Sequence, residues 1–178
     1  TEGAPIPRIY GRYRVAGQVI WATRFKETVK TTKQSTGGGK GGGGGGGGTV
    51  TTTEYFYSCS FAVAICEGPI DRVERIWADG NLLDLSTGGG PEGNQPLKYR
   101  IYYGTETQSV DPLMEAIEGV GNNPAYRGIA YVVFEDMGLG QFGNRIPQLR
   151  FEVVRNLGKE YSDTMESSVK GVCMLPGS

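Results

Sequence analysis

Residues 53–66 read TEYFYSCSFAVAIC and show the clearest structural pattern in the chain. Large or apolar side chains occupy every second position, and smaller or polar side chains lie between them. Because successive side chains of a strand point to opposite faces, this period of two predicts a long β-strand. Gly68-Pro69 ends it. The two predicted faces are Tyr55, Tyr57, Cys59, Phe61, Val63 and Ile65 on one side, and Glu54, Ser58, Ser60, Ala62 and Ala64 on the other.

Similar patterns predict further strands on both sides of this one. Residues 17–27 alternate as a half-buried strand, with Val19, Trp21, Thr23 and Phe25 on one face. Downstream, residues 72–78 and 81–85 flank Asp79-Gly80, a dipeptide typical of a tight type I′ hairpin turn. Three more strands are predicted over residues 98–103, 129–134 and 149–153, of which the second is apolar on both faces and therefore central.

One segment has the signature of a helix. Asp111 is suited to be the N-cap and Pro112 to be the first helical residue, and a glycine at position 119 ends the segment. Leu113, Ile117 and Val120 would share its apolar stripe. With about six or seven strands and one short helix, the fold class is mostly β (α+β).

A glycine tract interrupts the predicted strands. Residues 37–48 are all Gly except Lys40, and such a segment cannot bury side chains to offset its backbone entropy. We therefore predict one β-rich domain over residues 1–155, interrupted by a flexible Gly-rich loop over residues 28–50. Residues 86–97 form a second loop, and residues 156–178 form a C-terminal linker toward a further domain.

The amino-acid composition excludes several classes of enzyme and metal site. The 178 residues include 18 Lys plus Arg, 19 Asp plus Glu and no His, which gives a formal net charge of -1. The absence of histidine excludes Ser-His-Asp and Cys-His hydrolases and His-ligated zinc. No apolar run approaches the roughly 20 residues that a membrane-spanning helix needs. We therefore expect neither a membrane span nor a neutral-pH histidine switch.

The three cysteines do not suggest a metal or redox site. Cys59, Cys66 and Cys173 lack the paired spacing of zinc or dithiol motifs. Cys59 and Cys66 lie seven residues apart in the predicted strand, on opposite faces and beyond disulfide reach. Three free thiols are the prediction.

Two glycine motifs are candidates for phosphate-binding sites. Residues 138–143 match the pattern GxGxxG, but Pro147 and the strand pattern beyond it exclude the helix that a dinucleotide site requires. Lys40 lies in a glycine run but lacks the following Ser or Thr of a P-loop. We expect no cofactor at either place.

Some carboxylates are candidates for the catalytic pair of a glycosidase. The candidates are Asp71, Glu74, Glu135 and Asp136, and no spacing in the sequence singles out two of them. Glu135 and Asp136 are adjacent on a strand, so they would point to opposite faces as solvated strand-end charges. We therefore assign no catalytic, cofactor-binding or metal-binding residues.

Charge is distributed unevenly along the chain. Residues 1–40 carry eight basic and two acidic groups, a local net of +6, whereas the remainder nets -7. Such a basic arm can track nucleic-acid phosphate, but we favour complementarity with an acidic neighbouring subunit. We do not expect a nucleic-acid partner.

Several segments, in order, resemble one family of proteins. The first is residues 4–17, APIPRIYGRYRVAG, followed by Val19-Ile20-Trp21. The others are FAVAICEGPI at 61–70, IWADG at 76–80, NPAYRGIAYVVFED at 123–136 and NRIPQLRFEV at 144–153. Together these segments are similar to the tail-tip, or host-specificity hub, proteins of long flexible-tailed phages, including the multidomain baseplate protein of gene transfer agents.

The resemblance implies a β-rich tail hub domain without enzyme activity, located in the virion at the tail tip or baseplate after synthesis in the host cytoplasm. It also implies a homotrimer in the full-length protein, with other tail or baseplate proteins and host cell-envelope components as partners. Two alternatives stay open. One is a carbohydrate-binding or glycoside-cleaving module that acts on the cell envelope, and the other is an element that contacts nucleic acid.

Overall fold

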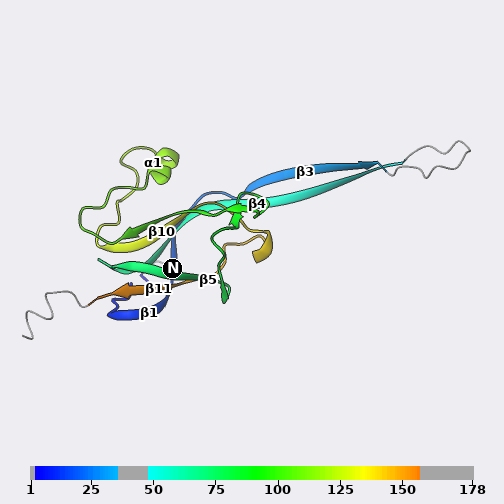
Figure 1. The fold of residues 1–178 in the computed structure, drawn as a ribbon. Coiled ribbons are helices and arrows are strands. Elements are labelled where there is room, and N and C mark those ends of the chain that lie inside the picture. Colours follow the sequence, from blue (N-terminus) through cyan, green and yellow to red (C-terminus); the bar gives the residue numbers. More distant parts are fainter. Residues whose placement is uncertain (1–2, 36–47, 157–178) are drawn as a thin grey trace, which may run out of the picture.

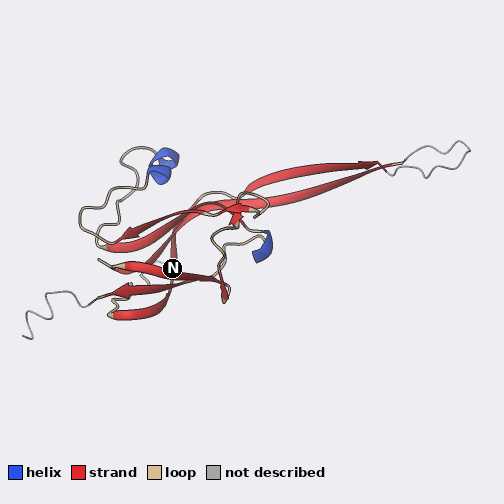
Figure 2. Ribbon diagram, in the orientation of Figure 1, coloured by secondary structure: helices blue, strands red, loops and turns tan. Residues whose placement is uncertain are grey.

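The predicted strand over residues 53–66 lies at the centre of the fold, as part of β4 (Thr49–Glu67). The structure is a computed structural model and describes residues 3–35 and 48–156. In these residues two antiparallel sheets pack face to face, and a short helix covers the outer face of the larger sheet (Figures 1 and 2). The β-rich fold class is therefore confirmed.

The smaller sheet joins the start of the chain to the end of the described part. Its strand order is β1-β11-β5-β6, and each neighbouring pair is antiparallel. Its strands are β1 (Gly11–Ala16), β5 (Arg72–Ala78), β6 (Asn81–Leu82) and β11 (Leu149–Arg155).

The larger sheet is built around β4 and β10. The order β2-β4-β10-β7-β8 forms its path, β3 also pairs with β4, and β9 also pairs with β10. The loop predicted over residues 86–97 thus contains two very short strands. Besides β4, the strands are β2 (Gln18–Ala22), β3 (Lys26–Ser35), β7 (Gly88–Gly89), β8 (Gln95–Pro96), β9 (Lys98–Tyr103) and β10 (Ile129–Gly138).

The core lies between the sheets. Phe61 of β4, Phe134 of β10 and Phe151 of β11 are fully buried and belong to one apolar cluster. Each such side chain contributes about 1.5–3 kcal/mol when it leaves water. The other side of β10 contributes Tyr131 and Val133 to a second cluster beneath the helix. β10 is apolar on both faces because both faces are covered, as the sequence predicted.

The helix α1 (Pro112–Glu118) begins as predicted, because the side chain of Asp111 caps it and Pro112 is in its first turn. The predicted stripe is wrong at two of its three positions, whereas Leu113 packs against the second cluster. Ile117 is 50% exposed and Val120 is 86% exposed, whereas Met114 is fully buried against the sheet. The seven-residue helix makes about two turns, so it can press only a narrow part of its surface onto the sheet.

The Gly-rich loop is shorter than predicted. Residues 28–35 belong to β3 and residues 49–50 to β4, and the ten-residue ladder between these strands runs from Lys26↔Ser58 to Ser35↔Thr49. Threonine-rich segments fit a pleated strand well even without a core, because β-branched side chains favour that backbone. The glycine tract at residues 37–47 lies outside the described residues, and the proposed division into domains stays a prediction.

The strand predicted over residues 17–27 is two strands. β2 ends at Ala22 and β3 begins at Lys26, and both pair with β4. Between them Thr23 donates its amide to the carbonyl of Ser60 and its hydroxyl accepts from the amide of Ser60. This side-chain contact replaces regular pairing and breaks the alternation.

A bulge changes the faces of β4. Ala130 pairs with Cys66, but the next residue, Tyr131, pairs with Ala64, so Ile65 is an extra residue. Cys59, Ile65 and Cys66 consequently belong to one buried cluster. The prediction that the two thiols lie on opposite faces is wrong, because a bulge shifts the phase of the alternation.

The hairpin turn is confirmed. Asp79 and Gly80 have φ angles of 48° and 89°, the positive values of a type I′ turn, and they join β5 to β6. The carboxylate of Asp79 accepts from the amide of Gln148 at 2.9 Å, which fastens the turn to the segment before β11.

Candidate functional site

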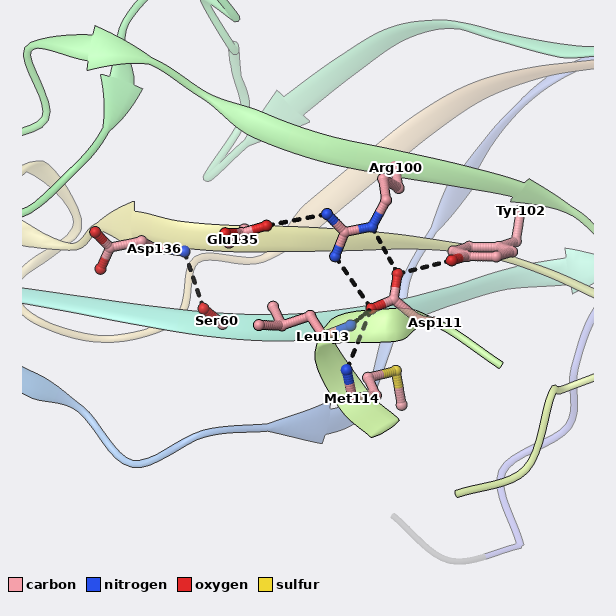
Figure 3. A network of polar contacts seen from close by, with 8 residues as sticks. All are labelled: Ser60, Arg100, Tyr102, Asp111, Leu113, Met114, Glu135 and Asp136. Atoms are coloured by element: carbon pink, nitrogen blue, oxygen red, sulfur yellow. Dashed lines mark hydrogen bonds and ion pairs between the residues drawn. The ribbon is translucent and has the colours of Figure 1, made fainter. Parts of the chain in front are cut away.

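The most extensive buried polar network surrounds the start of α1 (Figure 3). Arg100 of β9 donates from Nε to Oδ2 of Asp111 at 2.7 Å and from Nη2 to Oδ1 at 3.0 Å. Its third nitrogen, Nη1, donates to Glu135 of β10 at 3.0 Å. One guanidinium thus joins the helix cap to two strands of the larger sheet.

Asp111 satisfies several donors at once. It is fully buried and accepts hydrogen bonds from the amides of Leu113 and Met114 and from the hydroxyl of Tyr102. Burial raises the pKa of this carboxyl, but the hydrogen bonds from Arg100 and Tyr102 outweigh burial, so the pKa is lowered. Burial and the contact with Asp111 raise the pKa of Tyr102 to about 12.

This geometry makes a structural clamp and does not make an acid–base pair. Asp111 and Glu135 share one arginine, and the lowered pKa of Asp111 keeps it ionised at neutral pH. A general acid needs the opposite shift. Sequence reasoning identified Asp111 as a cap but missed Arg100, whose partner lies eleven residues away across a loop.

The predicted carboxylates are not brought together. Glu135 and Asp136 lie on β10 of the larger sheet, whereas Asp71 and Glu74 lie at β5 of the smaller sheet. In the larger sheet, Glu135 pairs with Arg100, and Asp136 accepts a hydrogen bond from Ser58 at 2.6 Å. At the smaller sheet, Asp71 accepts a hydrogen bond from the amide of Asn156. Glu74 pairs there with Arg12 and Arg72.

The expectation that Glu135 and Asp136 are solvated strand-end charges is incomplete, because each carboxylate also has a partner within the fold. Glu135 keeps about a third of its side chain exposed while it pairs with Arg100, and Asp136 has a φ of 51° at the register shift after Phe134. No cluster of three metal-ligating side chains occurs among the described residues.

The GxGxxG segment has no phosphate-binding context. Its first glycine, Gly138, ends β10, and the short 3-10 helix η1 (Gly140–Phe142) follows. Gly143 ends that turn with a φ of 67°. No α-helix opens here to bind a pyrophosphate. Lys40, the other phosphate candidate, lies outside the described residues.

The two described thiols are free and buried. Burial raises the pKa of Cys66 to about 11. It also raises the pKa of Cys59, although the hydrogen bonds with Thr23 act in the opposite direction. Thiols that stay protonated are poor nucleophiles, so neither is suited to catalysis. Cys173 lies outside the described residues.

The basic arm finds acidic partners within its own chain. Arg12 of β1 pairs with Glu74 at 2.7 Å, and Arg8 lies 3.9 Å from Glu67. Lys30 of β3 pairs with Glu92 at 2.9 Å. The interpretation that the arm complements a neighbouring subunit is not needed for these side chains, because the folded chain brings its own carboxylates beside them.

The β3–β4 hairpin extends beyond the two packed sheets (Figure 1). On one side β3 pairs with β4, and no other pairing of β3 occurs among the described residues. The pairing of β10 with β4 stops at Ser58, and the amide of Leu139 donates to the carbonyl of Tyr57, so the second edge of β4 is open along residues 49–56 in the described part of the chain. Several apolar side chains of this hairpin are exposed, namely Val29, Val50 and Tyr55.

No helix within residues 3–35 and 48–156 has the length and apolar character to cross a membrane. No protein-family model matches the sequence, and no curated protein matches it significantly. A match does occur among solved structures. It is a chain of the virion of a native gene transfer agent (GTA) particle, 40% identical to the whole of this chain, with a TM-score of 0.65. The present chain spans 33% of that chain's length. Over its entire length, then, this protein is similar to one third of a gene transfer agent virion protein.

Proposed function

We propose that this chain is a structural part of a phage-like virion, in the hub or baseplate at the tip of the tail. There it assembles with other copies of itself and with neighbouring tail proteins and contributes to attachment to the host cell envelope. The observation that carries the proposal is the 40% identity to a gene transfer agent virion chain across all of the present chain. Because the present chain spans 33% of that chain, the activity and partners of the whole protein belong to the proposal.

The β3–β4 hairpin supports an assembly role. An isolated two-stranded ribbon is marginally stable in water, and open edges readily accept another strand. Here the outer part of the ladder, from Val29↔Tyr55 to Ser35↔Thr49, extends from the body with exposed side chains on both strands. We propose that this hairpin is covered in a homotrimer of the full-length protein.

A non-enzymatic role is favoured by the arrangement of the carboxylates. Glycoside cleavage needs two carboxyl groups that face each other across a cleft. The four candidate carboxylates are divided between the two sheets, and each is engaged by an arginine, a serine or a backbone amide. No specific observation favours the carbohydrate-directed alternative.

The decisive experiment measures the oligomeric state of the full-length protein by light scattering. In one variant, residues 29–55 are replaced by a four-residue Gly-Ser turn that joins the paired residues Thr28 and Phe56. The expected result is a trimer for the unaltered protein and a monomer for this variant, with an unchanged melting transition of the body. In the matched control, only residues 37–47 are replaced by the same turn, so both strands remain and the trimer should persist.

A monomeric unaltered protein contradicts the trimer, and a trimeric hairpin-deleted variant contradicts the role of the hairpin. Location is tested separately. Antibodies against this chain should label one end of the tail in electron micrographs of particles. Labelling of the capsid instead contradicts the tail-tip assignment.

A further inference from the structure

Three arginines meet in a surface depression beside the Asp79-Gly80 turn. The depression has a volume of about 510 Å³ and lies on the side of the smaller sheet that faces away from the larger one. Arg14 comes from β1, Arg150 from β11, and Arg145 from the segment before β11. The complete lining is Arg14, Asp79, Gly80, Arg145, Gln148 and Arg150.

The positive charge of this depression is only partly neutralised within the described chain. Its single carboxylate, Asp79, already accepts from Arg145 at 2.8 Å and from the amide of Gln148 at 2.9 Å. No ion pair with a carboxylate is formed by Arg14 or Arg150 in residues 3–35 and 48–156. Two guanidinium groups are thus left to bind an anion.

Of the two arginines without a carboxylate partner, Arg14 is held in place before any ligand arrives, and the neighbouring Arg145 is also fixed. The guanidinium carbon of Arg14 lies 3.8 Å from the ring centroid of Trp77, a cation–π contact. Arg145 is fixed by both oxygens of Asp79. A guanidinium that is already ordered loses less entropy when it binds a carboxylate.

An apolar cavity of about 300 Å³ adjoins the arginines. Its lining includes Gln148 and Arg150, which also line the depression. It lies where the two sheets meet, between Val63 of β4 and Leu149 of β11. The rest of its lining is Ala16, Gly17, Val19, Ile146 and Pro147.

We propose that this surface binds an acidic segment of another protein, with its carboxylates on Arg14 and Arg150 and one aliphatic side chain in the adjoining cavity. A protein segment fits better than nucleic acid for two reasons. A phosphate backbone needs a continuous basic track, but Glu74 and Glu152 interrupt the positive charge on this face of the sheet. Base stacking needs an exposed aromatic face, but Arg14 lies over Trp77.

This inference goes beyond the proposed function. It names the chemistry of a partner and does not require that the partner be a virion protein. Its test therefore uses the chain alone, and its failure leaves the oligomeric-state experiment above unaffected.

The test is an NMR titration of the arginine side-chain N–H groups with the capped peptide Glu-Glu-Leu-Glu-Glu. Saturable shifts should appear at Arg14 and Arg150. The double variant Arg14→Gln, Arg150→Gln should bind at least about tenfold more weakly, because two charge-assisted contacts are lost. The matched control is Arg24→Gln, which removes an exposed charge elsewhere and should weaken binding by less than about twofold.

Two further probes identify what the surface recognises. The peptide Glu-Glu-Gly-Glu-Glu lacks the aliphatic side chain and should bind more weakly, and a single-stranded oligonucleotide of equal charge should bind more weakly still. The proposal is overturned if the leucine peptide does not bind, or if Arg24→Gln weakens its binding as much as the double variant does. It is also overturned if the glycine peptide binds as tightly as the leucine peptide, or if the oligonucleotide binds more tightly. Melting curves verify folding, and Arg150→Gln alone provides a variant that leaves the Arg14–Trp77 contact intact.

Discussion

Tyr102 and Tyr131 lie opposite each other on β9 and β10, with ring centroids 4.4 Å apart and ring planes within 4° of parallel. Their hydroxyl groups differ sharply. Tyr102 donates to Asp111 at 2.7 Å, whereas the buried hydroxyl of Tyr131 has no hydrogen-bond partner in the described structure. The ring of Tyr131 stacks on the ring of Tyr102, and the hydroxyl of Tyr102 bonds to the helix cap Asp111. The pair thus joins β10 to the start of the helix.

This difference predicts opposite effects of the same substitution. Tyr131→Phe removes a buried hydroxyl that forms no bond, so the free energy of unfolding should stay unchanged or rise by up to about 1 kcal/mol. Tyr102→Phe removes a hydrogen bond to a buried carboxylate and should lower the free energy of unfolding by about 1.5–3 kcal/mol. Urea denaturation of both variants measures this. Equal losses would show that the Tyr131 hydroxyl does find a partner.

Removal of the charge of Asp111 should be among the most damaging single changes. Asp111→Asn keeps the size of the side chain but breaks the pair with Arg100, which should cost about 3 kcal/mol of unfolding free energy. The matched control is Glu135→Gln, which alters the half-exposed partner of the same arginine and should cost less than about 1 kcal/mol. If both variants lose the same amount in urea denaturation, the burial of Asp111 does not govern the strength of the pair.

The lowered pKa of Asp111 predicts how stability depends on pH. Because its pKa is lower in the folded state than in the unfolded chain, its stabilising contribution is complete above the ordinary aspartate value of about 4. That contribution is lost as the pH falls through the lowered folded-state pKa. The difference in unfolding free energy between the unaltered protein and Asp111→Asn should therefore be constant near neutral pH and shrink in acid. A constant difference down to the acid limit would contradict the assigned shift.

A substitution at Gly80 in the β5–β6 turn should lower the free energy of unfolding only through the backbone conformation. Gly80 has a φ of 89°, and a Cβ placed there meets no atom within 4 Å. Gly80→Val should therefore lower the unfolding free energy by about 1–2 kcal/mol through backbone strain alone. Gly80→Asn should cost less, since asparagine tolerates positive φ. The two melting temperatures check this, and equal values close to that of the unaltered protein would reject the turn geometry.

Much of the fold follows from local sequence patterns. The alternation of side chains predicts the strand β4, and the apolar character of both faces predicts that β10 is central. The dipeptide Asp79-Gly80 predicts the hairpin that joins β5 to β6. Asp111 and Pro112 specified where the helix begins. These features depend on side-chain periodicity and backbone preference within a few residues, so a single sequence contains them.

Tertiary structure decided the rest. The bulge at Ile65 brought Cys59 and Cys66 into one cluster, and chain folding placed Glu74 beside Arg12 and Asp111 beside Arg100. The three-arginine depression joins residues that are up to 136 positions apart, Arg14 and Arg150. Local sequence determines which backbone conformation a segment adopts and which of its faces is apolar. Register shifts and charge pairing between distant segments depend on how the two sheets pack, because only packing sets which side chains meet.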